Sequence, residues 1–332
     1  MAGLSRFLVR RALTFIPTVV GATFIVFLVA AVIPANPARL WAGGEKANPQ
    51  VVEQLVREYH LKDPIIVQYY FFMEKLLTNS MVSPVTHNKV WEDVFRYFPV
   101  TFQLAILAFV MVLAIGIPLG IISALKRDTW VDTTIRIIAL IGVSTPIFWL
   151  AYLLIFVFFT ELKLITLAGT PTPPYSITGI PLIDAIIMLD GKTLSQILAR
   201  YTLPAFVLAY PSIGVVARLV RNSFLDAMGS DFVEYIEARG LPRSWKYRHV
   251  LRNAMVPIVT VLGLMFGGLL AGAPITETVF GLPGLGRYML QAINNYDYLS
   301  LIGALFLVSL IYVIANLVVD ILYAVIDPRV RY

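Results

Sequence analysis

Long uncharged apolar runs alternate with shorter polar segments along this chain. Six of the runs predict membrane-spanning helices: Ala12–Ile33, Val100–Ser123, Ile137–Thr160, Tyr201–Ala217, Ala254–Ile275 and Leu299–Val319. The first is about 22 residues long, which at about 1.5 Å per residue covers roughly 33 Å, enough for a hydrocarbon core of about 30 Å. The fourth is the shortest and contains Pro204 and Pro211, which such helices tolerate where neighbouring groups satisfy the freed carbonyls. The pattern predicts an all-α polytopic membrane protein with six transmembrane helices.

Basic residues indicate the orientation of these helices. Arg6, Arg10 and Arg11 precede the first span, and lysine and arginine accumulate on the cytoplasmic side of a cell membrane. With six spans, both termini are then predicted to be cytoplasmic. The predicted inner segments hold about 15 of the 26 lysines and arginines, in agreement with this rule. The first apolar run is too long for a signal peptide, so it predicts a retained anchor.

The polar segments divide the chain into parts. Residues 1–33 are predicted to form the cytoplasmic N-terminus and the first span, and residues 34–96 a small extracytoplasmic helical domain. Residues 97–326 are predicted to form a five-helix transmembrane domain that includes a cytoplasmic loop at 222–253. Residues 327–332 are predicted to be a cytoplasmic tail.

Cap and turn residues predict local structure between the spans. "NPQVVEQLVREY" predicts a helix with Asn48 as its N-cap and Pro49 in its first turn, and "DPIIVQYYFFMEKLL" predicts the same arrangement with Asp63 and Pro64. The loop 161–200 begins rich in proline and then contains "IPLIDAIIML". That run is too short to cross a membrane, so it predicts an interfacial or re-entrant segment.

Composition supports the membrane class. Hydrophobic residues make up 58% of the 332 residues and charged residues 14%, where soluble domains have about 25% charged residues. The chain has no cysteine, which excludes disulfides, thiolate nucleophiles and zinc–thiolate sites. A net charge of +6 suggests nucleic acid in a soluble protein. Here the charge follows the positive-inside rule, so the predicted partner is the lipid bilayer and not nucleic acid.

No motif predicts catalysis or cofactor binding. The three histidines are far apart and form no HExxH pair, and no GxSxG nucleophile turn occurs. The stretch "GLPGLGRY" at Gly281–Tyr288 lacks the GK(S/T) ending of a phosphate-binding loop, and a tight turn explains its glycines. The chain is therefore predicted to hold no catalytic residue, no metal and no cofactor of its own.

Charged residues are scarce inside the predicted spans. Ion-coupled carriers usually keep such charges as functional sites, although each costs about 2.5–3.5 kcal/mol on insertion. Asp320 qualifies, with Asn316 one turn before it, and it lies near the predicted cytoplasmic end. We expect a structural hydrogen-bonding role for these two residues. An ion-coupled secondary transporter thereby becomes a remote alternative.

Small residues recur at i and i+4 in the predicted fifth span. The stretch "GLMFGGLLAG" contains two such pairs, Gly263/Gly267 and Gly268/Gly272. This spacing lets helix backbones approach closely in lipid. Two roles remain open for these glycines. One is packing within the chain, and the other is a subunit interface or a translocation wall.

One polar island, "DFVEYIEARGLPRSWKYRHVLRNAMVPIVT" at Asp231–Thr260, interrupts the apolar sequence. It predicts a short helix over Asp231–Arg239, closed by Gly240 in the left-handed conformation and followed by Pro242 as a stop. A second helix is predicted from about Ser244 into the fifth span. The island therefore predicts a helix–turn–helix on the cytoplasmic side.

The two halves of the island differ in charge. Phe232, Val233 and Ile236 form an apolar stripe on the first helix. The acidic residues of that helix are Asp231, Glu234 and Glu237. The basic residues after the glycine fit phospholipid headgroups, but an acidic helix does not. An acidic, partly apolar helix that projects from a membrane predicts a ligand for a groove on a soluble protein.

The island resembles the cytoplasmic "EAA" loop of ATP-binding-cassette importer permeases, whose pattern is E-A-A-x3-G. Glu234 and Gly240 keep this spacing, while Tyr235 and Ile236 replace the two alanines. The variant is similar to the oligopeptide/dipeptide/nickel branch, where a D-(Y/F)-V…A-(R/K)-G-L…RHxLRNAxxPxVT string is typical. Four other stretches resemble the same branch: "YFPVTFQLAI", "STPIFWLAYLLI", "TETVFGLPGLGRYMLQAINNYDY" and "NLVVDILYAVIDPRVRY". "NSMVSPVTHN" departs from it, because a Gly-Asp-Leu-Gly-like stretch is typical there.

The resemblance implies a type I importer permease fold and a set of partners. These are a second homologous permease, two cytoplasmic ATP-binding subunits and an extracytoplasmic substrate-binding protein. ATP and magnesium would be bound by the ATPases, so this subunit is expected to be non-catalytic. The substrates implied are short peptides, with oligosaccharides as the alternative. Nickel is disfavoured because no cluster of histidine and carboxylate ligands faces the pathway.

The resemblance also implies roles for individual residues. Those expected to form a coupling loop that contacts an ATPase are Asp231, Glu234, Glu237, Ala238, Arg239, Gly240, Leu241 and Pro242. Those expected in an outer loop or gate are Glu277, Phe280, Pro283, Gly284 and Gly286. Closure of the ATPase pair is then expected to shift the spans as rigid bodies, which gives alternating access.

Overall fold

The fold is that of a computed structural model, which describes residues 13, 16–29, 37–164, 169–271 and 273–326, with the side chains of 45 and 319–326 left aside. This part of the chain is helical, and its only extended pairing is an isolated antiparallel bridge between Val82 and Lys89. The all-α prediction is confirmed for the residues described.

The helices of the described part follow one another with short connections. In chain order they are Ile16–Val29, α2 (Pro37–Trp41), the 3-10 turn η1 (Gly44–Lys46), α3 (Pro49–Glu58), α4 (Ile65–Leu77), α5 (Val90–Met111), the π-helical η2 (Val112–Gly116), α6 (Ile117–Leu125), α7 (Trp130–Ser144), α8 (Ile147–Ile155), the π-helical η3 (Phe156–Glu161), α9 (Pro181–Ile187), α10 (Gly191–Met228), α11 (Asp231–Ala238), α12 (Arg243–Leu270), α13 (Pro274–Val279), α14 (Leu285–Asn294) and α15 (Tyr298–Ile326).

Four helices are long and apolar enough to cross a membrane. They are Val90–Leu125, which runs from α5 through α6, then α10, α12, and Tyr298–Val318 within α15. A fifth span is obtained if α7 and the helix Ile147–Glu161 count as one. The helix Ile16–Val29 is apolar but shorter, and several residues of the predicted first span lie outside the described residues. The chain is therefore a multi-pass membrane protein.

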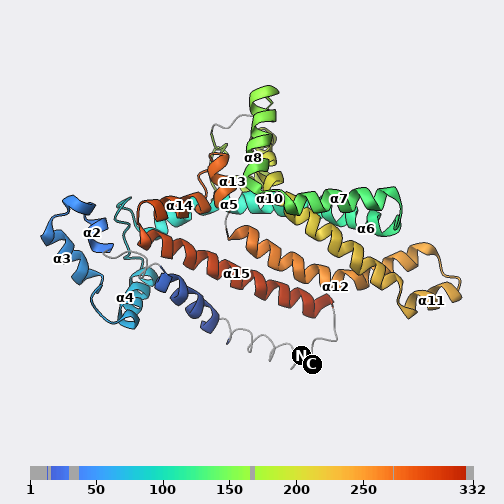
Figure 1. Cartoon of the computed structure of the whole chain (residues 1–332), viewed down its shortest axis with the longest axis horizontal. Coiled ribbons are helices and arrows are strands. Elements are labelled where there is room, and N and C mark those ends of the chain that lie inside the picture. The colour runs from blue at the N-terminus through green and yellow to red at the C-terminus, as the bar shows by residue number, and fades with distance from the viewer. Residues whose placement is uncertain (1–12, 14–15, 30–36, 165–168, 272, 327–332) are drawn as a thin grey trace.

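The predicted third span is broken. We expected one helix over Ile137–Thr160, which is wrong, because the helices on either side of Thr145 and Pro146 are bent by 101°. Proline lacks an N–H group and disfavours helical geometry in the residue before it. Thr145 accordingly takes an extended conformation, with φ −79° and ψ 124°. In Figure 1, α8 stands across the direction of α7.

The helix of the predicted fifth span begins before Ala254 and ends before Ile275. A single helix, α12, runs from Arg243 to Leu270, so the second helix of the island does continue into the span as predicted. Its predicted end at Ile275 is wrong, because Pro274 opens the separate helix α13, which contains Ile275. The fourth span is longer than predicted, since α10 covers 38 residues.

α10 lies at the centre of the bundle. It packs against α5, α6, α7 and α12, and α12 in turn packs along α15. In Figure 1, α2–α4 lie at one end of the bundle and α11 with the α6–α7 turn at the other. We call these the α3 end and the α11 end. The larger apolar core surrounds α10, and a second core joins α4, α14, α15 and the helix Ile16–Val29.

Glycines bring α10 close to its neighbours. A Cβ atom on Gly214 would lie 2.5 Å from the carbonyl oxygen of Ala139 in α7. A Cβ atom on Gly120 of α6 would lie 2.5 Å from a side-chain carbon of Val220. Interiors this dense leave little room for one helix to slide past another. The helices α6, α7 and α10 therefore form one closely packed unit.

One of the two predicted helix caps near the α3 end is correct. The Asn48 side chain accepts a hydrogen bond from the N–H of Gln50, with Pro49 in the first turn of α3. The cap predicted at Asp63 is wrong, because α4 begins at Ile65 and Pro64 occupies the cap position. Asp63 instead lies 2.8 Å from the Nδ1 atom of His60. The boundary placed at 96/97 falls inside α5.

Candidate functional site

The coupling segment predicted at the polar island is a short helix with one buried face. Val233 and Ile236 of α11 are buried, and Phe232 packs partly buried against the main core. The predicted apolar stripe is therefore confirmed. It attaches α11 to the bundle, while the acidic residues on the remaining surface are exposed.

A glycine closes α11 as predicted. Gly240 has φ +66°, in the left-handed region that L side chains rarely adopt. Its N–H donates to the carbonyl of Glu237 at 2.9 Å, and the N–H of Leu241 donates to the carbonyl of Ile236 at 3.3 Å. These two bonds form the Schellman arrangement that satisfies the last carbonyls of a helix. Pro242 then holds the cap position of α12.

The acidic and basic halves of the island are linked. Lys246 of α12 forms an ion pair with Glu237 at 2.8 Å, and the Arg239 guanidinium lies 4.6 Å from the centre of the Tyr235 ring. Asp231 and Glu234 form no ion pair with any described residue and are exposed. Their carboxylates at the end of the bundle thus stay available to another protein.

A second predicted cluster extends from α13 to the start of α14, and its Glu277, in α13, is fully buried. Its carboxylate accepts a hydrogen bond from the Thr101 hydroxyl at 2.6 Å and another from the N–H of Arg287 at 2.8 Å. The Thr101 oxygen itself accepts from the N–H of Leu285 at 2.7 Å. Leu285 and Arg287 lie in the first turn of α14, whose N–H groups lack partners inside the helix.

Glu277 therefore caps α14 and ties the loop to α5. A negative charge is favourable at a helix N-terminus. Burial raises the pKa of the Glu277 carboxyl, and the hydrogen bonds from Thr101 and Arg287 oppose that rise. The carboxylate fills its position so closely that a Cβ atom on Gly284 would touch it, and one on Gly286 would lie 3.0 Å from Oε2.

The other predicted loop residues have different surroundings. Phe280 is buried, whereas Pro283 is exposed. The Phe280 carbonyl, at the end of α13, accepts a hydrogen bond from the Arg200 guanidinium at 2.8 Å. The structure thus brings Glu277, Gly284 and Gly286 together and places Phe280 against α10.

Two charged contacts were not predicted from the sequence. Arg200 of α10 is 6% exposed and donates to the carbonyls of Phe280 and Gly169. Asp132 of α7 is fully buried, and its carboxylate accepts hydrogen bonds from the Nε and Nη2 atoms of Arg221 of α10, at 2.8 and 2.7 Å. The available signal was the position of Arg200 and Arg221 just outside the predicted fourth span.

The predicted glycine pairs do not act alike. Gly267 packs against α15, since a Cβ atom there would lie 2.9 Å from the Tyr312 ring. Nothing lies within 4 Å of a Cβ atom on Gly268. Gly263 lines a cavity of about 700 Å³ between α5, α12 and α15, whose other lining residues are apolar. Gly272 lies outside the described residues.

The polar pair predicted in the last span is only partly described. The Asn316 Oδ1 atom is buried and accepts no hydrogen bond in the part of the chain that the structure describes. The hydrogen-bonding role expected of Asn316 is therefore not seen for this atom. The side chain of Asp320 lies outside the described residues.

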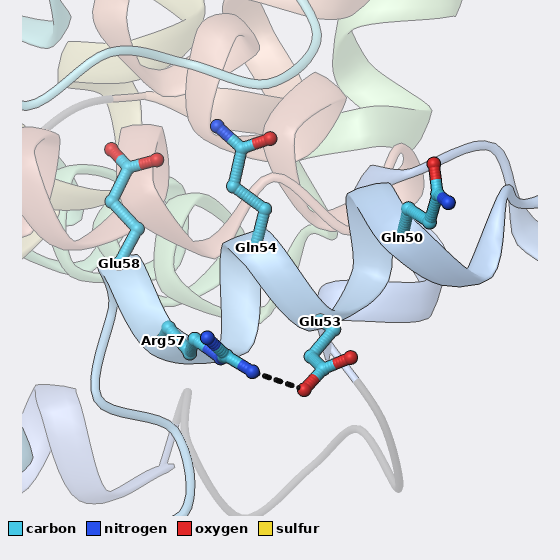
Figure 2. A pocket seen from close by; sticks show the side chains of 5 residues that line it. All are labelled: Gln50, Glu53, Gln54, Arg57 and Glu58. Carbon is cyan, nitrogen blue, oxygen red and sulfur yellow. Dashed lines mark hydrogen bonds and ion pairs between the residues drawn. The ribbon is translucent and has the colours of Figure 1, made fainter.

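The α3 end has a shallow polar hollow along α3. Figure 2 shows its lining residues, Gln50, Glu53, Gln54, Arg57 and Glu58. Arg57 and Glu53 form an exposed ion pair at 2.6 Å, and no residue of α3 is buried. Such a surface suits water and not lipid. No group of three or more metal-ligating side chains occurs among the described residues.

The Glu277 cap generates a prediction. Replacing Thr101 by valine removes the hydroxyl while keeping the shape, and leaves the Glu277 carboxylate and the Leu285 N–H without that partner. Each buried unsatisfied group costs about 1–3 kcal/mol, so Thr101→Val is expected to unfold at a clearly lower temperature. Thr101→Ser keeps the hydroxyl and serves as the control. Equal thermal unfolding midpoints for the two variants in detergent would contradict the cap.

Comparison with known proteins identifies the family. A family model described as the inner membrane component of binding-protein-dependent transport systems matches residues 116–332. A second model, described as the N-terminal part of such a membrane component, matches residues 4–105. Both agree with the resemblance found in the sequence.

Relatives match over nearly the whole chain. The dipeptide transport system permease protein DppB of Alkalihalophilus pseudofirmus is 37% identical, over 97% of this chain and 98% of that protein. The probable D,D-dipeptide transport system permease protein DdpB of Escherichia coli is 38% identical, over 97% and 96%. The glutathione transport system permease protein GsiC of Escherichia coli is 34% identical, over 98% and 99%. The chain belongs to the family of inner membrane components of binding-protein-dependent transport systems.

Proposed function

We propose that this chain is one of two permease subunits of an ATP-driven importer for short peptides, from dipeptides to oligopeptides. The observation that carries the substrate class is that the full-length relatives are named for dipeptides, D,D-dipeptides and glutathione, all of them short peptides. An extracytoplasmic binding protein delivers the peptide, and two cytoplasmic subunits bind and hydrolyse ATP. The chain itself is non-catalytic and holds no cofactor.

The proposal includes a six-span type I permease fold. The helix Ile16–Val29 belongs to the first span, and the bent pair of α7 and α8 forms the third. Helices α2–α4 form the extracytoplasmic domain between the first two spans. Support comes from the polar surface of α3, which no described contact buries.

We place the α11 end in the cytoplasm, together with both termini. Basic residues gather in the α6–α7 turn and in the first turns after α11, which fits the positive-inside rule. They are Lys126, Arg127, Arg239, Arg243, Lys246, Arg248 and Arg252. The α3 end then faces the binding protein.

α11 is the part of the chain proposed to contact an ATPase. Its apolar stripe is anchored in the bundle and its acidic face is exposed, so a groove on a soluble partner can take it up as a preformed helix. Asp231 and Glu234 are the acidic residues of that face that form no ion pair with a described residue. The ATPase pair then moves α11 together with the helices on which it is anchored.

Two glycines of α12 support a wall or an interface with the second permease. Gly263 lines the apolar cavity and Gly268 has open space beside it. Small residues at such positions let another backbone come close. Gly267 already allows such a close approach inside the chain, where it packs against Tyr312.

The coupling role generates the next prediction. Gly240→Pro is expected to break the closure of α11, because proline cannot adopt φ +66° and lacks the N–H that binds Glu237. Glu234→Lys reverses a charge on the exposed face. Both variants should remain in the membrane and reduce peptide-stimulated ATP hydrolysis of the reconstituted complex about fivefold or more.

A charge reversal at the other end is the matched control. Glu74 is exposed on α4, and Glu74→Lys should leave ATP hydrolysis coupled. Wild-type stimulation in both Gly240→Pro and Glu234→Lys would rule out α11 as the coupling segment.

Orientation is testable in this cysteine-free chain. A cysteine replacing Ala238 of α11 should resist a membrane-impermeant thiol reagent added outside intact cells. A cysteine replacing Tyr175, which is 64% exposed, should react with it. The reverse labelling pattern would invert the proposed topology.

A further inference from the structure

α10 carries two arginines that hold on to other elements at its two ends. Arg200 and Arg221 are roughly 32 Å apart along the helix at about 1.5 Å per residue, close to the thickness of a hydrocarbon core of about 30 Å. Arg200 is buried, and 14% of the Arg221 side chain is exposed. Both guanidinium groups therefore sit near a border of the membrane with most of their surface covered by protein.

The contact at the α11 end joins α10 to the α6–α7 turn. Asp132 receives Arg221 through both carboxylate oxygens, and the Ser123 hydroxyl donates to it at 2.6 Å. The N–H of Asp128, in the turn itself, donates at 3.1 Å. One carboxylate thus ties the end of α6, the turn and the start of α7 to α10. We call this the Asp132 clasp.

The contact at the opposite end joins α10 to the α13–α14 loop. Arg200 donates to the Phe280 carbonyl at 2.8 Å and to the Gly169 carbonyl at 3.2 Å, and it pairs with no described carboxylate. Phe280 ends α13, the helix whose Glu277 caps α14. A displacement of Arg200 is therefore expected to displace the α13–α14 loop, which the Glu277 cap stabilises. We call this the Arg200 clasp.

The part of α10 between the clasps packs closely against η2, α6 and α7. Gly116 and Gly120 lie against Val216 and Val220 of α10, and Gly214 lies against the backbone of α7. Pro204 and Pro211 remove backbone hydrogen bonds in this stretch, yet the helix is continuous from Gly191 to Met228. Beyond Met228, the short link of Gly229 and Ser230 leads directly into α11.

We propose that α10 transmits movement between α11 and the α13–α14 loop, and that the Asp132 clasp and the Arg200 clasp are its two attachment points. The inference rests on the proposed function of α11. Asp132, Arg221 and Arg200 are positioning residues, because none of them needs to touch peptide or ATPase. The Asp132 clasp makes the α6–α7 hairpin follow α10, and the Arg200 clasp makes the loop follow it.

A double-label experiment on the full complex tests this directly, since the chain has no cysteine of its own. Exposed positions Thr278 on α13 and Glu92 on α5 report the loop. Exposed positions Trp130 on α7 and Val318 on α15 report the α6–α7 turn. Each pair is converted to cysteines and spin-labelled, and its distance is measured with and without a non-hydrolysable ATP analogue.

Variants of the two clasps are expected to affect the two measured distances independently. Both distances should change with the ATP analogue in the otherwise unaltered complex. Arg200→Gln should abolish the change at the loop and keep the change at the turn, and Asp132→Asn should do the opposite. A purely structural role predicts no such one-sided loss. Arg218→Gln removes an exposed arginine of the same helix and should keep both changes.

Peptide-stimulated ATP hydrolysis gives a second readout. Arg200→Gln and Asp132→Asn should each lower stimulation about fivefold or more, with basal hydrolysis retained. If Asp132→Asn fails to assemble, the double variant Asp132→Arg/Arg221→Asp, which exchanges the two charges, is used instead. If this double variant assembles, peptide stimulation should also be restored.

Three results would overturn the inference. They are unchanged distance shifts in both clasp variants, loss of both shifts together in each variant, or restored assembly of the exchange variant without stimulation. A wild-type complex that shows no peptide stimulation would instead refute the proposed function, and the inference with it.

Discussion

A polar group that enters a bilayer must find its partner inside the protein, because no water is available to replace one. Three charged residues of α7 and α10, namely Asp132, Arg200 and Arg221, obey that constraint by bonding to other elements. Asp132 forms ion pairs with Arg221 at 2.7 Å and with Arg136 at 3.5 Å, and Arg200 donates to two backbone carbonyls. Each contact satisfies a buried charge and at the same time joins two elements that are distant in sequence. The same contacts therefore fix the arrangement of the bundle around α10.

The constraint also explains the two ends of the molecule. Near the Arg200 end of α10, Glu277 is buried and satisfies the first turn of α14 together with Thr101. At the α11 end, water is available, and Asp231 and Glu234 can stay exposed and unpaired. An unpaired acidic helix and a fully satisfied buried carboxylate thus reflect the same rule in two environments. The first is suited to a soluble partner and the second to a fixed loop.

Local structure was predictable wherever a few neighbouring residues decide it. The apolar stripe of α11 and the left-handed Gly240 follow from the sequence of the island alone. The Asn48 cap was found for the same reason. The Asp63 cap was wrong because Pro64 occupies the cap position and α4 begins at Ile65, one residue later than the cap pattern implies. The break at Pro146 was missed, because the apolar run Ile137–Thr160 was interpreted as one helix.

Long-range contacts were not predictable in the same way. Nothing near Asp132 in the sequence points to Arg221, and nothing near Thr101 points to Glu277. The role of each glycine also depends on the helix opposite, which is why Gly267 packs on Tyr312 while Gly268, one residue on, meets nothing. The family and the helix–turn–helix of the polar island were thus accessible from the sequence, and the clasps required the fold.

The central claim is that ATP hydrolysis by partner subunits, and not an ion gradient, drives peptides through this permease. Uptake of a labelled dipeptide into proteoliposomes that contain both permeases, both ATPases and the binding protein tests it most directly. The account predicts uptake that requires ATP and the loaded binding protein and persists when the proton gradient is dissipated. Uptake that proceeds without the ATPases and collapses with the proton gradient would contradict it.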